Sequence, residues 1–399
     1  MRHFHNIYCI LLCQVKHYID ENPFSHYNNA RFLDNANKGG VPIPLLYDQY
    51  LTKREYLARV GEIGQSFGIR CMEYAAGKAA FTRAYDVDTA GGLRFSVNES
   101  KGLDLFSFTY RGISFPFITK AALTSPWLAD EQGMAYRGCL GAGFLYTAGL
   151  SNVGGPCEDG GFYHYAHGNL KNIPAENVCW ETRWQGDECL LRICGDVRDA
   201  AFFGRNLLLH RQITANVGEK RLFLEDEIEN QGFAPEQVML LYHMNLGWPV
   251  LDEGTQLIAP VESAEPLSAH TSAHDANYAH MIAPIDENEE YLYALRLKRD
   301  SAGMTACCAY NPRLRLGLYV RYNADPLRYL IEWKCMCSGD YALGMLPSTC
   351  KPVGRIADRS SGESRVLAPF ETLKLRLEIG VIDGDAELND FRKSLSAMK

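Results

Sequence analysis

Two stretches of strict alternation between apolar and polar residues constrain the fold of this chain more than any other feature. Residues 313–322 read Arg-Leu-Arg-Leu-Gly-Leu-Tyr-Val-Arg-Tyr, and residues 372–380 read Thr-Leu-Lys-Leu-Arg-Leu-Glu-Ile-Gly. Because successive side chains of a strand point to opposite faces, each stretch predicts a β-strand with one leucine-rich face and one charged face. Strands of this kind are typical of antiparallel sheets, which bury one face and leave the other in water.

Similar short segments, separated by Gly, Asn, Asp and Pro, continue from about residue 70 almost to the end of the chain. Others lie at 190–193, 207–213, 221–228 and 291–297. No long Val- and Ile-rich runs alternate with helical segments, which argues against a parallel α/β sheet. The chain has 399 residues, enough for one large all-β domain with an appendage. We therefore predict a mostly β protein, a large antiparallel β-sandwich over residues 67–399.

Residues 1–66 lack the alternating apolar segments of the rest of the chain and predict an N-terminal extension with a short helix. Thr52 fits an N-cap, and Glu55 stands where it can close a capping box. Residues 28–44 are rich in Gly, Pro and Asn and predict a linker. About the first 25 residues predict a poorly ordered or loosely docked segment, whose apolar run only weakly resembles a signal peptide. One more helix is expected at 384–396.

Composition limits the partners and the compartment. The net charge is −8 with a pI near 5.8, and no Lys/Arg cluster rises above the background, so we expect no nucleic-acid partner. No segment reaches the ~18 apolar residues needed to span a bilayer, so we expect no membrane partner. The thirteen cysteines are scattered, without a CxxC pair. This favours reduced cysteines in a cytoplasmic protein.

The segment 240–249 (Leu-Leu-Tyr-His-Met-Asn-Leu-Gly-Trp-Pro) places polar residues inside an apolar run. In a strand, His243 and Asn245 would share one face, and Tyr242 and Met244 the other. Taken alone, this pattern favours a satisfied core pair, because buried polar groups usually find a partner. It is also compatible with the floor of a polar-ligand site.

The loop 152–175 concentrates aromatic residues, amides and histidines, including Tyr163, Tyr165 and His167. Such residues suit a sugar site, where rings stack on C–H faces and fixed polar groups bind hydroxyls. A polar loop with an incidental histidine is the alternative. The glycines of 138–149 do not spell a dinucleotide motif. A zinc site would need a third ligand, and the histidines of 270–280 lie in a stretch typical of a surface loop, so no metal is expected.

Five motifs, in order along the chain, resemble the aldose 1-epimerase (galactose mutarotase) superfamily, and most closely its DUF4432 branch. They are Lys101-Gly-Leu-Asp104, Gly141-Ala-Gly-Phe-Leu-Tyr-Thr-Ala-Gly-Leu150, His167-Gly-Asn-Leu-Lys-Asn-Ile-Pro-Ala175, Leu241-Tyr-His-Met-Asn-Leu-Gly-Trp-Pro249 and Tyr341-Ala-Leu-Gly-Met-Leu-Pro347. The resemblance implies a β-supersandwich fold and an aldose or aldose-derived ligand, with no cofactor. It assigns His243 as general acid and His167 as the group that binds the ring oxygen or a hydroxyl. A histidine can give and take a proton at neutral pH.

The chain departs from this family at the general base. Relatives commonly have Gly-Leu-Glu-Pro near the C-terminal end, where this chain has Gly344-Met-Leu-Pro347, so Leu346 replaces the expected glutamate. Lys101 and Asn169 also stand where arginine is common. Glu332 could supply the carboxylate from a neighbouring strand, or be a structural surface residue. Otherwise the scaffold runs different chemistry, or binds sugar without turning it over.

We therefore predict a carbohydrate-active protein, a cofactor-free aldose 1-epimerase, with a non-catalytic sugar-binding protein as the alternative. A lyase or hydrolase is less favoured, since no opposed pair of carboxylates accompanies the histidines. The expected partner is a small-molecule carbohydrate, and a homodimer stays open. The predicted catalytic residues are His243, His167 and Glu332. The predicted substrate-binding residues are Arg111, Asn172, Asn245, Trp248, Trp333 and Lys334.

Overall fold

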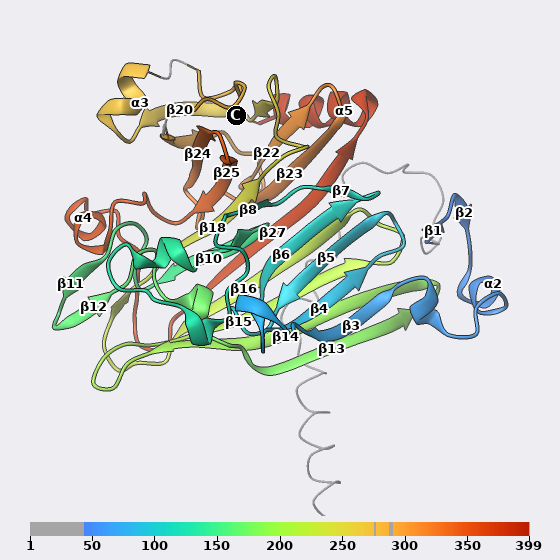
Figure 1. Ribbon diagram of the computed structural model, residues 1–399, viewed down its shortest axis with the longest axis horizontal. Coiled ribbons are helices and arrows are strands. Elements are labelled where there is room, and N and C mark those ends of the chain that lie inside the picture. The colour runs from blue at the N-terminus through green and yellow to red at the C-terminus, as the bar shows by residue number, and fades with distance from the viewer. Residues whose placement is uncertain (1–43, 275–276, 287–289, 399) are drawn as a thin grey trace, which may run out of the picture. The chain divides into compact units, whose positions relative to one another are not determined.

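The computed structural model describes residues 44–274, 277–286 and 290–398. The predicted N-terminal segment and most of the predicted linker lie outside the described residues. The predicted antiparallel β-sandwich is confirmed: two large sheets, both paired antiparallel, contain most of the strand residues of the described chain (Figure 1).

Within the described residues, the first sheet has 11 strands. In spatial order they are β20 (Val261–Pro266), β21 (Glu290–Leu297), β24 (Tyr329–Cys337), β25 (Asp340–Ser348), β18 (Met239–Leu246), β10 (Leu145–Leu150), β6 (Asp104–Tyr110), β5 (Leu93–Asn98), β4 (Arg83–Asp88) and β3 (Gly68–Glu73), with β7 (Ile113–Ser114) paired to β6.

The second sheet has 8 strands in the part of the chain that the structure describes. In spatial order they are β13 (Glu176–Gln185), β14 (Glu188–Ala200), β15 (Asn206–Asn216), β16 (Arg221–Asn230), β27 (Thr372–Asp383), β23 (Leu316–Asn323), β22 (Met304–Asn311) and β19 (Gln256–Ile258).

Short strand pairs and helices complete the described chain. The pairs are β1 (Leu45–Leu46) with β2 (Gln49–Tyr50), β8 (Phe117–Ile118) with β9 (Ala142–Gly143), β11 (Cys157–Asp159) with β12 (Phe162–His164), and β17 (Glu236–Gln237) with β26 (Val366–Leu367). The helices are α2 (Lys53–Leu57), α3 (Ala269–His274), α4 (Arg355–Ser360) and α5 (Asp385–Ser396), with 3-10 turns η1 (Ile63–Gln65), η2 (Gly77–Ala79), η3 (Pro126–Leu128), η4 (Ala135–Gly138) and η5 (Leu170–Asn172).

The two alternating stretches become neighbouring strands of the second sheet. β27 begins at Thr372 as predicted, and its leucines are buried. β23 begins at Leu316, three residues later than predicted. The reason is a turn: Asn311 Oδ1 accepts hydrogen bonds from the backbone N–H groups of Arg313 and Leu314. Arg315 then takes a positive φ of 53°, which a strand does not allow.

Both predicted helices are confirmed. The Thr52 hydroxyl caps α2 by accepting from the Glu55 backbone N–H, and the Glu55 carboxylate accepts from the Thr52 backbone N–H, which completes a capping box. Leu46 and Tyr56 are buried in the same apolar core as the sheets. At the other end of the chain, α5 buries one stripe of apolar residues, Leu388, Phe391 and Leu395.

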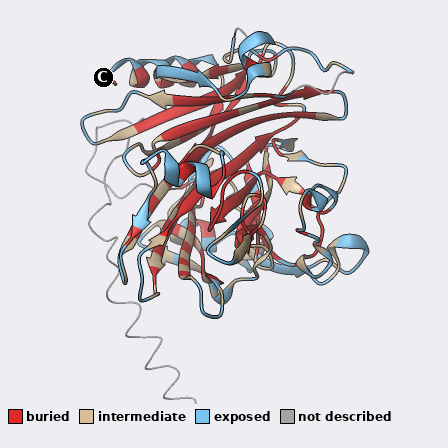
Figure 2. Cartoon of the chain, turned by 90° about the vertical axis from the view of Figure 1, so that its left-hand side faces the viewer, coloured by how far each residue is buried: buried red, intermediate tan, exposed pale blue. Residues whose placement is uncertain are grey.

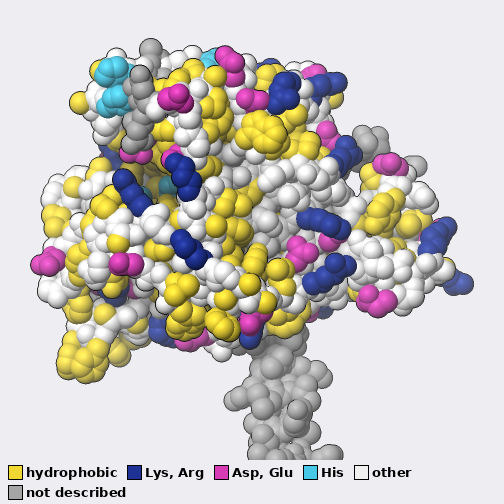
Figure 3. Space-filling view, viewed as in Figure 1, with side chains coloured by type: hydrophobic (Ala, Val, Ile, Leu, Met, Phe, Trp, Pro, Cys, Tyr) yellow, Lys and Arg dark blue, Asp and Glu magenta, His cyan; other side chains and the backbone are white. Residues whose placement is uncertain are grey.

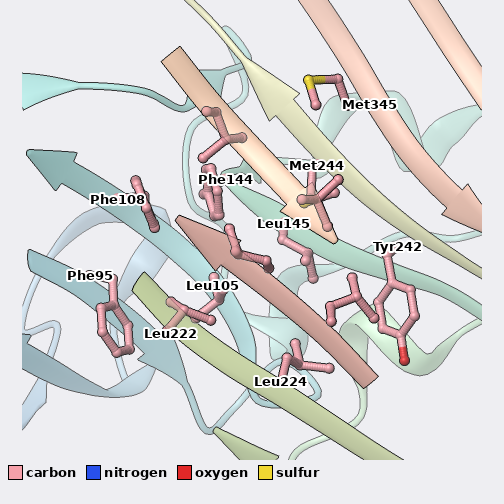
Figure 4. Close-up of a cluster of buried hydrophobic side chains, with 14 of the residues drawn as sticks. Phe95, Leu105, Phe108, Phe144, Leu145, Leu222, Leu224, Tyr242, Met244 and Met345 are labelled. Carbon is pink, nitrogen blue, oxygen red and sulfur yellow. The ribbon is translucent and has the colours of Figure 1, made fainter. Parts of the chain in front are cut away.

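The main core lies between the inner faces of the two sheets. Leu105, Phe108 and Leu145 from the first sheet meet Leu222 and Leu224 from the second, and all are fully buried (Figure 4). Each such side chain stabilises the fold by roughly 1.5–3 kcal/mol. The central strands are accordingly buried along most of their length, whereas the connecting loops are exposed (Figure 2).

A buried ionic network crosses this core. The Arg211 guanidinium on β15 contacts Asp226 at 2.7 Å and Asp104 at 2.8 Å. It also donates to the Thr147 hydroxyl, and the Tyr242 hydroxyl donates to Asp226 at 2.7 Å. The network thereby joins β15 and β16 of one sheet to β6, β10 and β18 of the other. Mutual pairing of this kind is what makes buried charges tolerable.

One expectation about the cysteines is wrong. Cys179 and Cys194 form a disulfide across β13 and β14. They are direct register partners of this antiparallel pair, a relation that their separation in sequence does not reveal. The other cysteines of the described chain carry free thiols. Among the described residues, no helix is long and apolar enough to cross a membrane.

Candidate functional site

All eight residues of β18 are buried, but its two sets of side chains have different surroundings. Leu240, Tyr242 and Met244 belong to the main core between the sheets. Met239 and Leu241 belong to a second, smaller apolar cluster, and they alternate with the core residues, so they lie on the other face of the sheet. His243 and Asn245 share that second face.

Register places four further side chains on this face: Tyr146, Leu346, Ile331 and Trp333. Tyr146 on β10 is the direct partner of His243. On the other side, Leu241 pairs with Ser348 and Asn245 pairs with Gly344, which puts Leu346 opposite His243. Leu346 in turn pairs with Ile331, two residues before Trp333 on β24. We call this set, with His243 and Asn245, the histidine face.

Asn245 fixes the tautomer of His243. The Asn245 amide nitrogen donates to the backbone oxygens of Gly143 at 3.1 Å and His243 at 2.9 Å. Its oxygen therefore faces His243 Nδ1, at 2.5 Å. The flipped amide would place oxygen against two carbonyl oxygens, so the network assigns the hydrogen to Nδ1. In the neutral ring, Nε2 is then a bare acceptor.

His167 reaches the same face from the loop between β12 and η5. Its backbone has a positive φ of 55°, an unusual conformation for this residue type. Two backbone hydrogen bonds hold it, from His167 N–H to Gly154 O at 2.9 Å and from Gly149 N–H to His167 O at 3.0 Å. Its ring meets that of His243 edge to face, with centroids 6.0 Å apart. The two histidines that the sequence paired are thus neighbours.

Both rings are held in the neutral form. Burial lowers the pKa of His243 to about 3, and the neighbouring His167 adds to the shift, while the bond to Asn245 opposes it. Burial also lowers the pKa of His167 to about 4, assisted by the positive charge of Lys171. At neutral pH the pair therefore offers lone pairs and N–H donors rather than positive charge.

Aromatic rings surround the histidines. Tyr146 stacks on His243 with centroids 4.4 Å apart and planes within 16°. Trp333, a predicted substrate-binding residue, approaches the same imidazole edge-on at 5.6 Å. Tyr136, in η4, packs edge-on against His167 at 6.3 Å. Neither Tyr136 nor Tyr146 was predicted from the sequence as a site residue. Tyr146 belongs to the motif 141–150, but only strand register reveals its partner.

A buried charged cluster supports the His167 loop. Lys171 Nζ, 2% exposed, pairs with Glu131 at 2.8 Å and donates to the carbonyl oxygens of Ala166 at 3.1 Å and Gly168 at 2.5 Å, on either side of His167. Asn172 donates to Glu131 and accepts from Lys101. The predicted residue Asn172 therefore lies in this cluster. Glu131 and Lys171 had not been singled out from the sequence.

Two predicted site residues face away from the histidines. Glu332 and Lys334 flank Trp333 on β24, and strand alternation turns them to the opposite face. Lys334 packs there over the ring of Tyr291, a residue of the main core, and Glu332 is fully buried. The expectation that Glu332 stands across from His243 as a base is therefore corrected. That place belongs to Leu346, which is 2% exposed.

Arg111 and Trp248 also stand apart from the histidine pair. Arg111 occupies the tight turn after β6, and its guanidinium pairs with Asp383 at the end of β27, at 2.8 Å. Trp248 follows β18 and leaves 68% of its surface exposed. No ring contact links it to either histidine within the described chain.

The described ranges contain no group of three His, Cys, Asp or Glu side chains arranged to hold a metal ion. The histidines of α3 stack on one another, with His270 and His274 centroids 4.5 Å apart, and histidine side chains are visible at the surface near α3 (Figure 3). On the face shown there, Lys and Arg side chains are scattered among other residues rather than gathered into one patch.

The family described as a domain of unknown function, DUF4432, matches residues 80–381, more than half of the chain. The protein belongs to the DUF4432 family. This match includes every residue of the histidine face and its supporting cluster. No curated protein matches the chain.

Solved structures similar to this DUF4432 protein share its fold. An aldose 1-epimerase candidate from Klebsiella pneumoniae has a TM-score of 0.78 at 18% identity, over 83% of this chain and 87% of that one. A galactose mutarotase-like protein from Clostridium acetobutylicum has a TM-score of 0.55 at 14% identity, over 80% of this chain and 99% of that one. Galactose 1-epimerase from Lactobacillus acidophilus has a TM-score of 0.52 at 13% identity, over 80% and 100%.

Proposed function

We propose that this DUF4432 protein binds an aldose or a sugar acid on the histidine face and interconverts its anomers without a cofactor. The observation that carries the proposal is the neutral pair His167 and His243, which meet at 6.0 Å beside stacked and edge-on aromatic rings. Rings of this kind pack on the C–H faces of a sugar, and imidazole and amide groups bind its hydroxyls. The solved proteins named as aldose 1-epimerases or mutarotase-like proteins, which share the fold, support the same ligand class.

Anomer interconversion requires two proton transfers. One group removes the proton of the anomeric hydroxyl while another protonates the ring oxygen; the ring opens, the C1–C2 bond rotates, and the ring closes again. Because Nδ1 of His243 donates to Asn245, Nε2 enters the reaction as the acceptor. We therefore propose His243 as the base in ring opening and the acid when the ring closes, in place of the general acid that the family resemblance implies for ring opening. His167 binds a hydroxyl from the adjoining side.

The test follows the anomers directly. Freshly dissolved α-D-glucose, α-D-galactose and D-galacturonic acid are monitored by NMR as they equilibrate with wild type, with His243→Ala and with buffer alone. Wild type should accelerate at least one of them, and His243→Ala should lose most of that acceleration. His210→Ala is the matched control, since His210 lies on β15 of the other sheet, paired with Asp196. Equal rates for wild type, His243→Ala and buffer would refute the catalytic proposal.

A second candidate is a sugar-binding protein without turnover. It is favoured by one observation, that Leu346 lies across from His243 where a mutarotase-like relative would carry a carboxylate. Such a protein would gain thermal stability with a sugar, about 2.7 kcal/mol at a concentration 100 times Kd, and accelerate no anomerisation. Stabilisation of wild type together with an accelerated rate would exclude it.

A further inference from the structure

Tyr146 supplies the aromatic ring nearest to His243, and the catalytic scheme above leaves it without a role. It comes from β10, is directly opposite His243 in register, and stacks in parallel on the imidazole at 4.4 Å. Only 5% of its surface is exposed. Its position therefore depends on the sheet itself and not on a loop.

The hydroxyl of Tyr146 extends beyond the imidazole. Parallel side chains on neighbouring strands point in the same direction, and a tyrosine is longer than a histidine by the breadth of its phenol. With the two rings stacked, the Tyr146 oxygen therefore extends past the imidazole on the same face of the sheet. In the described part of the chain, the hydroxyls of Tyr85, Tyr110 and Tyr242 each donate a hydrogen bond to a carboxylate. The Tyr146 hydroxyl makes no such hydrogen bond to any described residue.

The surroundings keep this hydroxyl protonated. Burial raises the pKa of Tyr146 well above 10, and the nearby Tyr136, Asp104 and Glu131 add to the shift. The other group that touches the ring, His243, is neutral at ordinary pH. Tyr146 is thus a donor and His243 an acceptor on one face.

We propose that Tyr146 is the proton donor that works with His243, and that the pair replaces the histidine–carboxylate pair that the family resemblance implies. The inference rests on the proposed function and adds a catalytic residue to it. It also explains how Leu346 can stand next to His243 in an active protein, because His243 supplies the base and no carboxylate is needed.

The proposed step is balanced. His243 Nε2 takes the proton of the anomeric hydroxyl, the C1–O1 bond becomes a carbonyl, and the C1–O5 bond breaks. The electron pair of that bond takes the proton of the Tyr146 hydroxyl. The imidazolium and the tyrosinate form a transient ion pair beside the open-chain aldehyde. Closure on either face of the carbonyl reverses both transfers and restores the neutral groups that burial favours. Since the two transfers occur together, neither group has to be charged beforehand.

The experiment compares anomerisation of α-D-galactose, α-D-glucose and D-galacturonic acid by wild type, Tyr146→Phe and Tyr322→Phe. Tyr322→Phe removes the same oxygen from a buried tyrosine on β23 of the other sheet. Loss of a general acid typically costs 10²–10⁴-fold. Tyr146→Phe should lose about 100-fold or more of kcat and retain KM within about threefold. Tyr322→Phe should retain kcat.

A second variant separates a chemical from a structural role. Incorporation of 3-fluorotyrosine at position 146 keeps the ring and the hydroxyl but makes the hydroxyl more acidic. The alkaline limb of the pH–rate profile should then move to lower pH, which a merely structural role would not cause. Such a shift supports the inference even if Tyr146→Phe fails to fold.

The outcomes are distinguishable. If wild type accelerates anomerisation and both Tyr146→Phe and the fluorinated protein match it at every pH, the role of Tyr146 is refuted and the proposed function stands. If wild type accelerates none of the three sugars, the proposed function is refuted and this inference with it.

Discussion

The buried neutral state of His243 predicts how the stability of the fold depends on pH. The pKa is lowered from 6.5 to about 3 in the folded chain. The unfolded chain therefore binds the proton more readily, and stability falls as pH drops from about 6.5 toward 3. Linkage gives a loss of about 2 kcal/mol from this residue between pH 7.5 and 5.

His167, with its pKa lowered to about 4, contributes a similar loss of about 2 kcal/mol over the same interval. A total near 4 kcal/mol is a large part of the 5–15 kcal/mol that typically stabilises a domain. His164, with its pKa also lowered by burial, acts in the same direction, whereas His210, raised by Asp196, acts in the opposite one. The contributions of His167, His164 and His210 are the same in wild type and in a His243 variant. They therefore cancel when the free energies of unfolding of the two proteins are subtracted.

The assay is urea unfolding of wild type and His243→Gln at several pH values between about 7.5 and 5. Glutamine keeps a donor for Asn245 but does not titrate. The free energy of unfolding of the variant should fall less steeply, with a difference from wild type that changes by about 2 kcal/mol across this range. His210→Gln serves as the control and should change the slope in the opposite sense. Parallel curves for wild type and His243→Gln would show that His243 is not buried in the neutral form, and the assignment of Nε2 as a base would lose its foundation.

Three further substitutions test the structure around the histidines. Leu346→Glu should raise the pKa of His243, measured by NMR titration of its ring, because a carboxylate would then face the imidazole; an unchanged pKa would contradict the register of β18 and β25. Lys171→Met should lower the free energy of unfolding in urea by about 3–5 kcal/mol, because it leaves Glu131 buried without its cation. Adding Glu131→Gln should recover part of this loss, and no recovery would contradict the pairing. Gly168→Ala should lower both Tm and any rate of anomerisation, because the new Cβ would clash with Gly149 O and residue 168 has a φ of +67°. A variant with unchanged Tm would refute this packing.

The sequence predicted those parts of the fold that depend on local pattern. Alternation located β27, and the Thr52–Glu55 spacing located α2, because strand and cap signals involve residues a few positions apart. His167 and His243 were paired only through the resemblance to a family. His167 lies in a loop and His243 in a strand, and no pattern of neighbouring residues predicts that the two are in contact.

The remaining features depend on register between strands. Alternation alone would have placed Glu332 and Trp333 on opposite faces, but which face carries His243 follows from how β18, β25 and β24 align. The stack of Tyr146 on His243 and the disulfide of Cys179 with Cys194 have the same origin. The contact of Lys171 with Glu131 joins η5 to a distant loop, and the sequence does not specify the path of either segment.

The Arg211 network has a consequence for how this protein can change. A slip of one residue along β18 would exchange the faces of His243 and Tyr242, because side chains alternate. The bond from the Tyr242 hydroxyl to Asp226, held in turn by Arg211, anchors β18 from the inner side and opposes such a slip. Substitutions at positions 243, 346 and 333 can therefore change the chemistry of the histidine face without changing the register of β18. A lineage could replace a carboxylate by Leu346, or accept a different sugar, while the strand beneath keeps its place.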